Sequence, residues 1–413
     1  MPAYRSTATD RDLAPARTVV TVGPVDGLTV AGVQAVLDRA VAVRPDPRLA
    51  LRPDAGARRW DYDADTVRGA VTDRPDLDTT DLGRLVSQIR SRPGARRPIE
   101  VFVCGQFLVL DYSHGIGDGQ FGTIGLAELA RGAQADVRLL ADGLPRGAVW
   151  TALRRHFGAH PGAVRRFLEL RAHHRGADTA AAERRITDWE PTKRSITRYL
   201  DPEKTGRLRT WVKQHCPGAT TASVSVDMWL SALQAEGVAF DERVMILMNC
   251  RRYLAAGYAT AQGNFAVGIP LRIPRQRDPA MIAASVRAVL DSGWPLAILG
   301  MAEISAIRGN ADPPSAAASV EVPNRLRLAV SDLGTLRVFD GVPFATNRPA
   351  QLSAFLEPDG PDAATLLVSE LNGGRTFTAS FCTAMIDADV IERAVDRMCD
   401  DPVALVSGGQ VAQ

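Results

Sequence analysis

A glycine-rich loop between a strand and a helix is the feature that most constrains the fold of this chain. Residues 107–112 are rich in β-forming side chains, residues 113–119 read SHGIGDG, and a helical pattern follows over residues 121–131. Such a loop lies at the edge of a sheet, where a preceding strand holds its side chains rigidly. Because glycine adopts positive φ readily and has no side chain, another molecule can approach the loop closely. The pattern indicates an α/β chain with a functional loop at one sheet edge.

The segments around this loop predict one mixed lobe. Residues 18–22 read as a strand, and residues 30–41 carry apolar side chains at three- and four-residue steps, which predicts a helix. A second amphipathic helix is expected at residues 81–90. Residues 99–103 are expected to form a hairpin with the strand that enters the loop.

The second half of the chain predicts another mixture of strands and helices. Its clearest signal is a hairpin of residues 366–371 and 377–385 across Asn372-Gly373-Gly374, since these turn residues tolerate positive φ. We therefore predict two two-layer α+β sandwich lobes, residues 1–190 and residues 191–413. The other elements expected in the second lobe are strands at 195–200, 244–248, 265–273 and 327–331, helices at 202–215 and 221–237, a loop at 310–323, and a final helix capped by Asp387.

Residues 150–198 predict mostly helix and are rich in arginine. Eight arginines of this stretch, most of them in adjacent pairs, lie along the helical pattern. Runs of charged residues like this usually face solvent. An anion-binding or carrier-protein-docking face is the alternative interpretation. The arginines are Arg154, Arg155, Arg165, Arg166, Arg171, Arg175, Arg184 and Arg185.

The composition argues against several classes of function. The chain has 49 basic and 47 acidic residues and a net charge of +2, which is too little for a nucleic-acid-binding surface. Its first residues lack the apolar run of a secretory signal, and the weakly polar stretch 295–307 is interrupted by Glu303 and shorter than the roughly 20 residues that cross a bilayer. We expect a cytoplasmic protein without a membrane span.

The cysteine pattern predicts neither disulfides nor a metal site. The five cysteines are odd in number, lie far apart and include no C-x-x-C pair. We expect buried, reduced thiols and no bound metal.

His114 is the candidate catalytic residue, since it lies at the end of a strand beside Gly115, Gly117 and Gly119. An imidazole titrates near pH 6.5, so at neutral pH it can take a proton from a hydroxyl or amine and return it to a leaving group. Asp118 can fold back to fix the loop. The alternative is a histidine that only caps a turn, with Asp118 as the N-cap of the following helix.

These residues resemble the motifs of the CoA-dependent acyltransferase superfamily, which includes chloramphenicol acetyltransferase, the plant BAHD acyltransferases and nonribosomal peptide condensation domains. Residues 114–119 are similar to the H-x-x-x-D-G motif, and residues 223–230 to a helix with T-x-N-D-x-x-L. Residues 249–252 with 263–265 are similar to v-x-x-R and G-N segments, and residues 331–334 to an S-N-x-G turn. The order of the motifs covers nearly the whole chain.

Three departures bear on what this resemblance implies. Ser113 stands where condensation domains commonly have a first histidine, which favours a stand-alone acyltransferase. Asp332 replaces the usual asparagine of the turn, so the resemblance gives it no polar role. The plant D-F-G-W-G motif is missing from the sequence, so a plant-type member is not indicated.

The resemblance implies two chloramphenicol-acetyltransferase-like lobes with His114 in a tunnel at their interface. His114 would deprotonate an acceptor hydroxyl or amine, which attacks a thioester carbonyl without an acyl-enzyme. Asp118 would orient the loop by pairing with Arg251, the arginine of the v-x-x-R segment.

The resemblance also suggests which groups would contact substrate. A backbone amide near Gly119 or the Ser331 hydroxyl would stabilise the oxyanion. Ser113 and Asn264 are the other candidate substrate-binding residues, and a turn-forming role for Asn264 after Gly263 stays open.

The resemblance therefore predicts an acyltransferase of bacterial natural-product biosynthesis. No permanently bound cofactor is expected; acyl-CoA or acyl-phosphopantetheine would be the co-substrate. A small-molecule acceptor and an acyl or peptidyl carrier protein are the expected partners of a monomer.

Three alternatives stay open from the sequence. One is a condensation-like amide synthase, and another is a non-catalytic binding member of the same fold. The third is a Rossmann oxidoreductase, because residues 117–122 read G-x-G-x-x-G between a strand and a helix.

Overall fold

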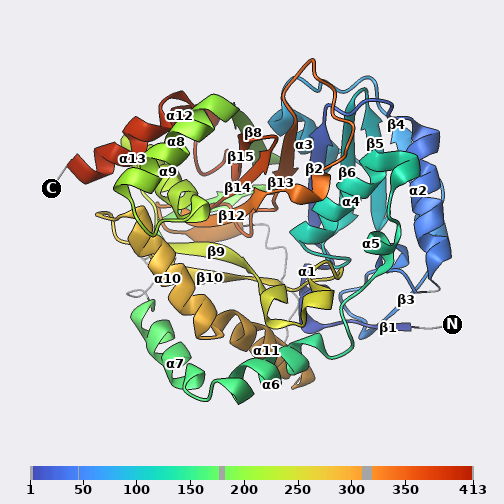
Figure 1. Ribbon diagram of the computed structural model, residues 1–413, viewed down its shortest axis with the longest axis horizontal. Coiled ribbons are helices and arrows are strands. Elements are labelled where there is room, and N and C mark those ends of the chain that lie inside the picture. The colour runs from blue at the N-terminus through green and yellow to red at the C-terminus, as the bar shows by residue number, and fades with distance from the viewer. Residues whose placement is uncertain (1–2, 45, 176–181, 309–318, 412–413) are drawn as a thin grey trace.

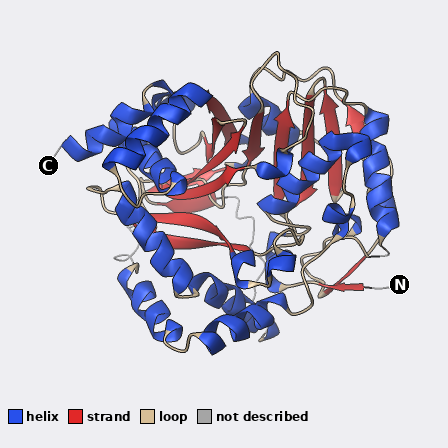
Figure 2. Ribbon diagram, in the orientation of Figure 1, coloured by secondary structure: helices blue, strands red, loops and turns tan. Residues whose placement is uncertain are grey.

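Two separate β-sheets, each packed against helices, organise the chain (Figures 1 and 2). The computed structural model describes residues 3–44, 46–175, 182–308 and 319–411. The loop predicted at residues 310–323 lies mostly outside these ranges, and its described end forms the short strand β11 (Ser319–Val322). The two sheets confirm the predicted α/β class.

The first sheet has five strands in the order β13-β2-β6-β5-β4. Strand β6 is antiparallel to both of its neighbours, β2 and β5, and only β4 and β5 run parallel. A dinucleotide-binding loop needs a parallel βαβ unit, so the Rossmann alternative is wrong. The strands are β2 (Arg17–Gly23), β4 (Val71–Asp73), β5 (Ile99–Cys104), β6 (Phe107–Ser113) and β13 (Gln351–Phe355).

Helices cover both faces of this sheet because both faces are apolar. Along β6, Leu108 and Leu110 pack on the side of α2 (Val30–Val43) and α4 (Gly119–Arg131). Phe107 and Val109 point the other way, toward α3 (Leu82–Ser91). Successive side chains of a strand alternate between the two faces, so a continuous apolar run is what a strand buried on both sides requires.

The second sheet has six strands in the order β10-β9-β12-β14-β15-β8. Strand β12 runs parallel to β9 and β14, and the other pairs are antiparallel. The predicted hairpin joins β14 to β15, with Asn372 and Gly373 at positive φ. The strands are β8 (Lys193–Leu200), β9 (Arg243–Asn249), β10 (Ala266–Arg272), β12 (Arg327–Thr335), β14 (Ala363–Leu371) and β15 (Gly374–Cys382).

Helices gather on one face of the second sheet (Figure 1). Trp229 of α9, with Leu230 and Leu233, is fully buried against Ile246 and Val330 of the sheet, which confirms these residues as core. Asp387 caps the last predicted helix through the amide of Asp389. The covering helices are α8 (Pro202–His215), α9 (Thr221–Ala235), α10 (Pro279–Asp291), α12 (Ala388–Asp400) and α13 (Pro402–Val411).

No single point in the sequence separates the strands of the first sheet from those of the second. Strand β13 comes from the second half of the chain but pairs with β2 of the first sheet, from Gln351 opposite Gly23 to Phe355 opposite Val19. Helix α3 of the first half packs against β8 of the second sheet. The polypeptide therefore crosses between the lobes after its predicted boundary at residue 190.

The arginine-rich stretch is helical only in part. It contains α6 (Ala148–Ala159) and α7 (Ala163–His173), but Arg184–Thr187 forms strand β7, which pairs with β11. Helix prediction was wrong for this last segment because its pairing partner is more than 130 residues away. The remaining described elements are β1 (Ala3–Arg5), α1 (Ala8–Leu13), β3 (Arg59–Asp61), α5 (Arg138–Ala141), α11 (Trp294–Ile307) and seven short 3-10 helices.

Among the described residues, no single helix has both the length and the apolar composition of a membrane span. The pair α10 and α11 meets that test only jointly, and the two helices are bent by 49° at their junction.

Gly83 marks the closest approach of α3 to β8. A Cβ atom at this position would lie 2.5 Å from the Ser195 carbonyl oxygen and 2.8 Å from the Thr197 amide nitrogen. Glycine is unfavourable inside a helix, so its presence here is explained by the backbone that it must accommodate.

Gly83→Ala should therefore destabilise the chain by about 1–3 kcal/mol through overpacking, although alanine is the better helix former. Gly206→Ala in α8 is the matched control, since a Cβ there meets nothing within 4 Å. The control should be neutral or stabilising by about 1 kcal/mol. Urea unfolding of both variants measures this, and equal behaviour of the two would show that α3 is not pressed against β8.

Candidate active site

The histidine loop begins where β6 leaves the first sheet. The His114 amide donates to the Ala16 carbonyl at 2.8 Å, which continues the pairing of β6 with β2 for one more residue. The side chain is half-buried, and its Nδ1 has no hydrogen-bond partner among the described residues. No described residue therefore uses the imidazole to cap the turn, and its Nδ1 atom is buried.

Close packing explains the first glycine of the loop. A Cβ at Gly115 would lie 2.9 Å from Ala14 Cα and from the Asp10 carbonyl oxygen, so any side chain would push the loop off helix α1. Ser113 is buried beside it: its hydroxyl donates to the Ala14 carbonyl at 2.7 Å and accepts from the Gly115 amide at 3.3 Å. The structure thus places Ser113, a predicted substrate contact, inside the turn.

The expected ion pair between Asp118 and Arg251 is present and buried. Arg251 Nη1 lies 2.8 Å from Asp118 Oδ2 and Nη2 lies 3.2 Å from Oδ1, so the contact is bidentate. The carboxylate also accepts from the amides of Gln120 and Phe265 at 3.1 and 3.0 Å. Asp118 therefore caps α4 and pairs with Arg251 at the same time, so both contacts that the sequence suggested for Asp118 are present.

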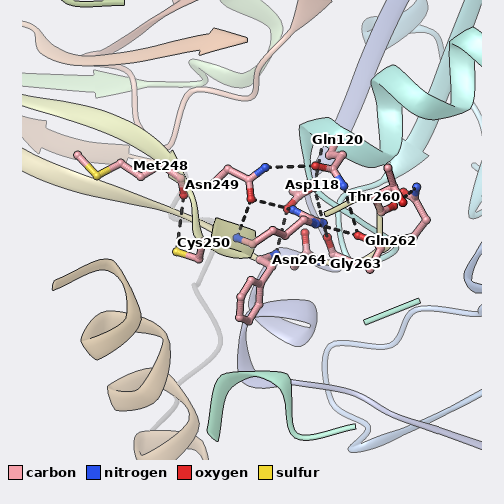
Figure 3. A network of polar contacts seen from close by, with 12 residues as sticks. Asp118, Gln120, Met248, Asn249, Cys250, Thr260, Gln262, Gly263 and Asn264 are labelled. Carbon is pink, nitrogen blue, oxygen red and sulfur yellow. Dashed lines mark hydrogen bonds and ion pairs between the residues drawn. The ribbon is translucent and has the colours of Figure 1, made fainter. Parts of the chain in front are cut away.

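Arg251 uses its remaining donors on the second lobe. Nε donates to the Ala261 carbonyl at 2.8 Å and Nη2 to the Gly263 carbonyl at 2.7 Å. The Asn249 side chain accepts from the Arg251 amide at 2.9 Å and donates to Gln120 at 3.2 Å (Figure 3). Helix α4 of the first lobe is thereby bonded to the end of β9 in the second.

Asn264 holds the other side of the loop. Its Nδ2 lies 2.9 Å from the His114 carbonyl, 3.1 Å from the Gly115 carbonyl and 3.0 Å from Asp10 Oδ1. The residue is buried. Its contacts are those of a residue that positions the histidine, whereas the sequence suggested a contact with substrate.

Arg48 is a second positioning residue, which sequence reasoning missed. Its guanidinium donates to the carbonyls of Ile116 and Gly115 at 2.7 and 3.1 Å and pairs with Asp10 at 3.0 Å. Arg48 and Asp10 are both buried. Neither lies near the loop in sequence, so no local motif could have identified them.

The face of the second sheet away from its helices lies toward the loop. On β9, Val244, Ile246 and Met248 pack among the helices, so Leu247 between them points to the other face and is 39% exposed. On the neighbouring β12, Ser331 shares that face, and none of the described residues hydrogen-bonds its hydroxyl. Leu333 Cδ2 is 3.9 Å from where a Cβ of Gly119 would lie. A partly apolar wall with one free hydroxyl thus faces the loop.

Asp332 points to the helix side of β12. Its carboxylate accepts from the Ser225 hydroxyl at 2.5 Å, from Arg375 at 3.0 Å and from the Gly334 amide at 2.8 Å. Arg375, which the sequence analysis did not identify, is itself buried. The acid that replaces the asparagine of the motif is therefore neutralised by a buried arginine and shapes the turn.

Gly119 supplies a free amide beside the histidine. It is the first residue of α4, and no described residue accepts a hydrogen bond from its N–H. The N-terminus of a helix carries a partial positive charge, which favours an anion at this point. Such an amide can stabilise a developing oxyanion.

Thiol and metal chemistry have no support near the loop. Burial raises the pKa of the Cys250 thiol to about 12, so it stays protonated and unreactive at neutral pH. All five cysteines are buried, as expected. Within the described ranges, no cluster of three or more His, Cys, Asp or Glu side chains is suited to a metal ion.

Comparison with solved structures identifies the architecture. The trichothecene 15-O-acetyltransferase of Fusarium sporotrichioides superposes with a TM-score of 0.66 at 12% identity, over 98% of this chain and 95% of that one. The first condensation domain of the calcium-dependent antibiotic synthetase, solved with a substrate analogue, gives 0.61 at 16%, over 98% and 97%. The X-domain of teicoplanin biosynthesis, in complex with OxyB, gives 0.55 at 15%, over 99% and 95%.

The chain has the same fold as these acetyltransferase and condensation-domain structures. The sequence itself matches no family model and no curated protein. At 12–16% identity the structural likeness establishes the two-lobe fold, while a tunnel at the lobe interface stays a prediction.

Arg251→Ala should destabilise the chain by about 3–5 kcal/mol, because it leaves the buried Asp118 carboxylate without its cation. The double variant Asp118→Asn/Arg251→Met removes both charges and should recover part of that loss. Denaturant unfolding of Asp118→Asn, Arg251→Met and the double variant, which share the same substitutions, measures the coupling. Additive losses would show that the two side chains do not interact in solution.

Proposed function

We propose that this protein transfers an acyl group from a thioester to a hydroxyl or amine, with His114 as the general base. The proposal rests on a contrast within the loop between the groups that are hydrogen-bonded to neighbours and the His114 ring, which is not. Ser113, Asp118 and the carbonyls of residues 114–116 are all engaged by neighbours, whereas the His114 ring is half-exposed and makes no hydrogen bond with a described residue. A rigid loop that presents one free imidazole is suited to proton transfer.

The chemistry needs only one protein group to move protons. A His114 ring nitrogen takes the proton from the acceptor O–H or N–H while the acceptor attacks the thioester carbonyl carbon. The tetrahedral intermediate then collapses, the C–S bond breaks, and the imidazolium returns the proton to the departing thiolate. No bond forms between the acyl group and the protein.

The Gly119 amide and the Ser331 hydroxyl are the proposed oxyanion donors. Both are free of other partners in the described chain, and they belong to opposite lobes. Removal of one such donor typically costs about 3 kcal/mol of transition-state stabilisation. Asp118, Arg251, Asn264 and Arg48 act as positioning residues, because their contacts are with the loop.

The proposed acyl transfer also indicates the acyl donor and the binding partners of the protein. An acyl-CoA or an acyl-phosphopantetheine on a carrier protein presents the same reacting thioester, and a small molecule supplies the acceptor. The condensation-domain likeness supports a role in natural-product biosynthesis with either ester or amide as product.

A binding role without turnover is the second candidate. One structural neighbour, the teicoplanin X-domain, was solved in complex with another protein, OxyB. The fold therefore also occurs in a protein that binds a partner, and fold alone does not establish catalysis.

His114→Ala should lower acyl transfer by roughly 10²–10⁴-fold, the contribution of a general base, without loss of folding. Intact-mass screening of acyl-CoA donors with pooled alcohols and amines finds the reaction, and the variant is then compared with wild type. His215→Ala is the matched control, since this histidine is exposed on α8 and its ring contacts only Trp211.

Two results would contradict the proposal. Product formation that survives His114→Ala at the wild-type rate would remove the general base. A folded wild-type protein that transfers no acyl group from CoA or carrier donors would favour the binding role.

A further inference from the structure

A cavity of about 340 Å³ lies between helices α8 and α9. Both helices cover the same face of the second sheet (Figure 1). The Ser331 hydroxyl belongs to the opposite face, because side chains alternate along β12 and its neighbour Val330 packs among the helices. The sheet therefore separates this cavity from the wall that faces the histidine loop.

The walls of the cavity are largely apolar. One stripe of α8, with its members three or four residues apart, lines one side, and the first turns of α9 line the other. A cavity of a few hundred Å³ with apolar walls and a few polar groups is typical of a site for a small ligand. The apolar lining side chains include Leu208, Val212, Ala219 and Val224.

Arg375 of β15 places a buried guanidinium in this lining. The residue is 1% exposed. Its Nη2 donates to the Ser225 hydroxyl at 2.7 Å and to Asp332 at 3.0 Å. The Nε atom is buried, and no described residue accepts a hydrogen bond from Nε or from Nη1. A buried donor without a partner is costly, so these N–H groups are suited to an acceptor from outside the chain.

The charges around the cavity do not cancel. Glu370 pairs with Arg209 and Asp332 pairs with Arg375, whereas no described carboxylate forms an ion pair with Lys213. Lys213 is exposed and lines the cavity with the two arginines. Burial lowers the pKa of Arg375, because the loss of water disfavours its charge more than the two carboxylates favour it. One positive charge at the cavity is therefore left without a counter-ion.

We propose that this cavity binds a small monocarboxylate with an apolar body, at a site that no step of the proposed acyl transfer uses. The carboxylate accepts from the unpaired donors of Arg375, with Lys213 as the second cation. The apolar body lies against Leu208, Val212 and Val224. A single negative charge matches the one uncompensated positive charge, whereas a phosphate dianion would leave excess negative charge among apolar walls, which is costly.

Isothermal titration with a set of six-carbon ligands tests the charge and the apolar body separately. Hexanoate should bind at least about tenfold more tightly than hexanol, because a hydrogen bond to a charged group contributes about that factor. Acetate should bind more weakly than hexanoate, since each buried CH₂ contributes roughly fourfold. Equal affinity for hexanoate and hexanol would overturn the proposal, and so would tighter binding of hexyl phosphate than of hexanoate.

Two variants test the cationic groups. Arg375→Met/Asp332→Asn removes both buried charges together, so neither is left alone, and a melting curve checks that the variant is folded. It should bind hexanoate at least about tenfold more weakly and hexanol unchanged. Lys213→Met should also weaken hexanoate alone. Arg207→Met is the matched control, since Arg207 is exposed on the same helix but is not part of the cavity lining.

The apolar wall has its own test, which leaves the buried ion pair intact. Val212→Phe fills part of the cavity and should weaken hexanoate and hexanol alike, again with a melting curve as the check on folding. Hexanoate affinity that is the same in wild type, Lys213→Met and Val212→Phe would place the ligand elsewhere and overturn the proposal.

A nuclear magnetic resonance spectrum of the arginine side chains locates the bound carboxylate directly. The Nε–H signal that is missing from Arg375→Met/Asp332→Asn identifies Arg375, and this signal should move when hexanoate is added to wild type. A signal that stays in place while hexanoate binds would contradict the assignment.

His114→Ala separates this site from the proposed function. The variant should bind hexanoate with wild-type affinity, because the histidine loop does not line the cavity. If hexanoate binds through Arg375 but no acyl transfer is found, the proposed function fails and the site stands. If acyl transfer depends on His114 but hexanoate does not bind at Arg375, the site is wrong and the function stands.

Discussion

The buried ion pair between Asp118 and Arg251 is the contact on which the site depends. It joins the histidine loop of the first lobe to the end of β9 in the second, and its bidentate geometry fixes their relative orientation. Burying two charges is costly unless every polar atom is satisfied. Here the amides of Gln120 and Phe265 and the carbonyls of Ala261 and Gly263 complete the hydrogen bonding. The ion pair therefore fixes the position of the histidine loop relative to the end of β9 and is not simply a source of stability.

Along the histidine loop, the backbone carbonyls are hydrogen-bonded by neighbouring side chains and, among the described residues, the imidazole is not. The loop carbonyls are held by Asn264 and Arg48, whose common partner is Asp10, while no described residue hydrogen-bonds the imidazole or the Gly119 amide. In the proposed reaction, groups that are fixed before substrate arrives need no reorganisation, which is the main source of electrostatic catalysis.

The sequence predicted those features of the fold that depend on residues close together in the chain. The hairpin into the loop, the cap at Asp118 and the Asn372-Gly373 turn depend on neighbouring residues, and the structure confirms all three. Strand β13 could not be found this way, because its place in the first sheet depends on pairing with a strand more than 300 residues earlier. The same limit applies to Arg48 and Asp10. For Ser113 and Asn264 the sequence suggested contacts with substrate, whereas in the structure they bond to backbone carbonyls, which no side-chain pattern reveals.

Position 113 also bears on the proposal that one imidazole serves both halves of the proton transfer. The Ser113 side chain is buried between the Ala14 carbonyl and the Gly115 amide, and both bonds are made by a single short hydroxyl. The neighbouring turn is closely packed, since a Cβ at Gly115 would lie 2.9 Å from Ala14 Cα. In this chain, position 113 therefore holds the turn and supplies no second ring. In the proposed mechanism the base and the acid are then the same imidazole, so the proton taken from the acceptor is the one available to the departing thiolate.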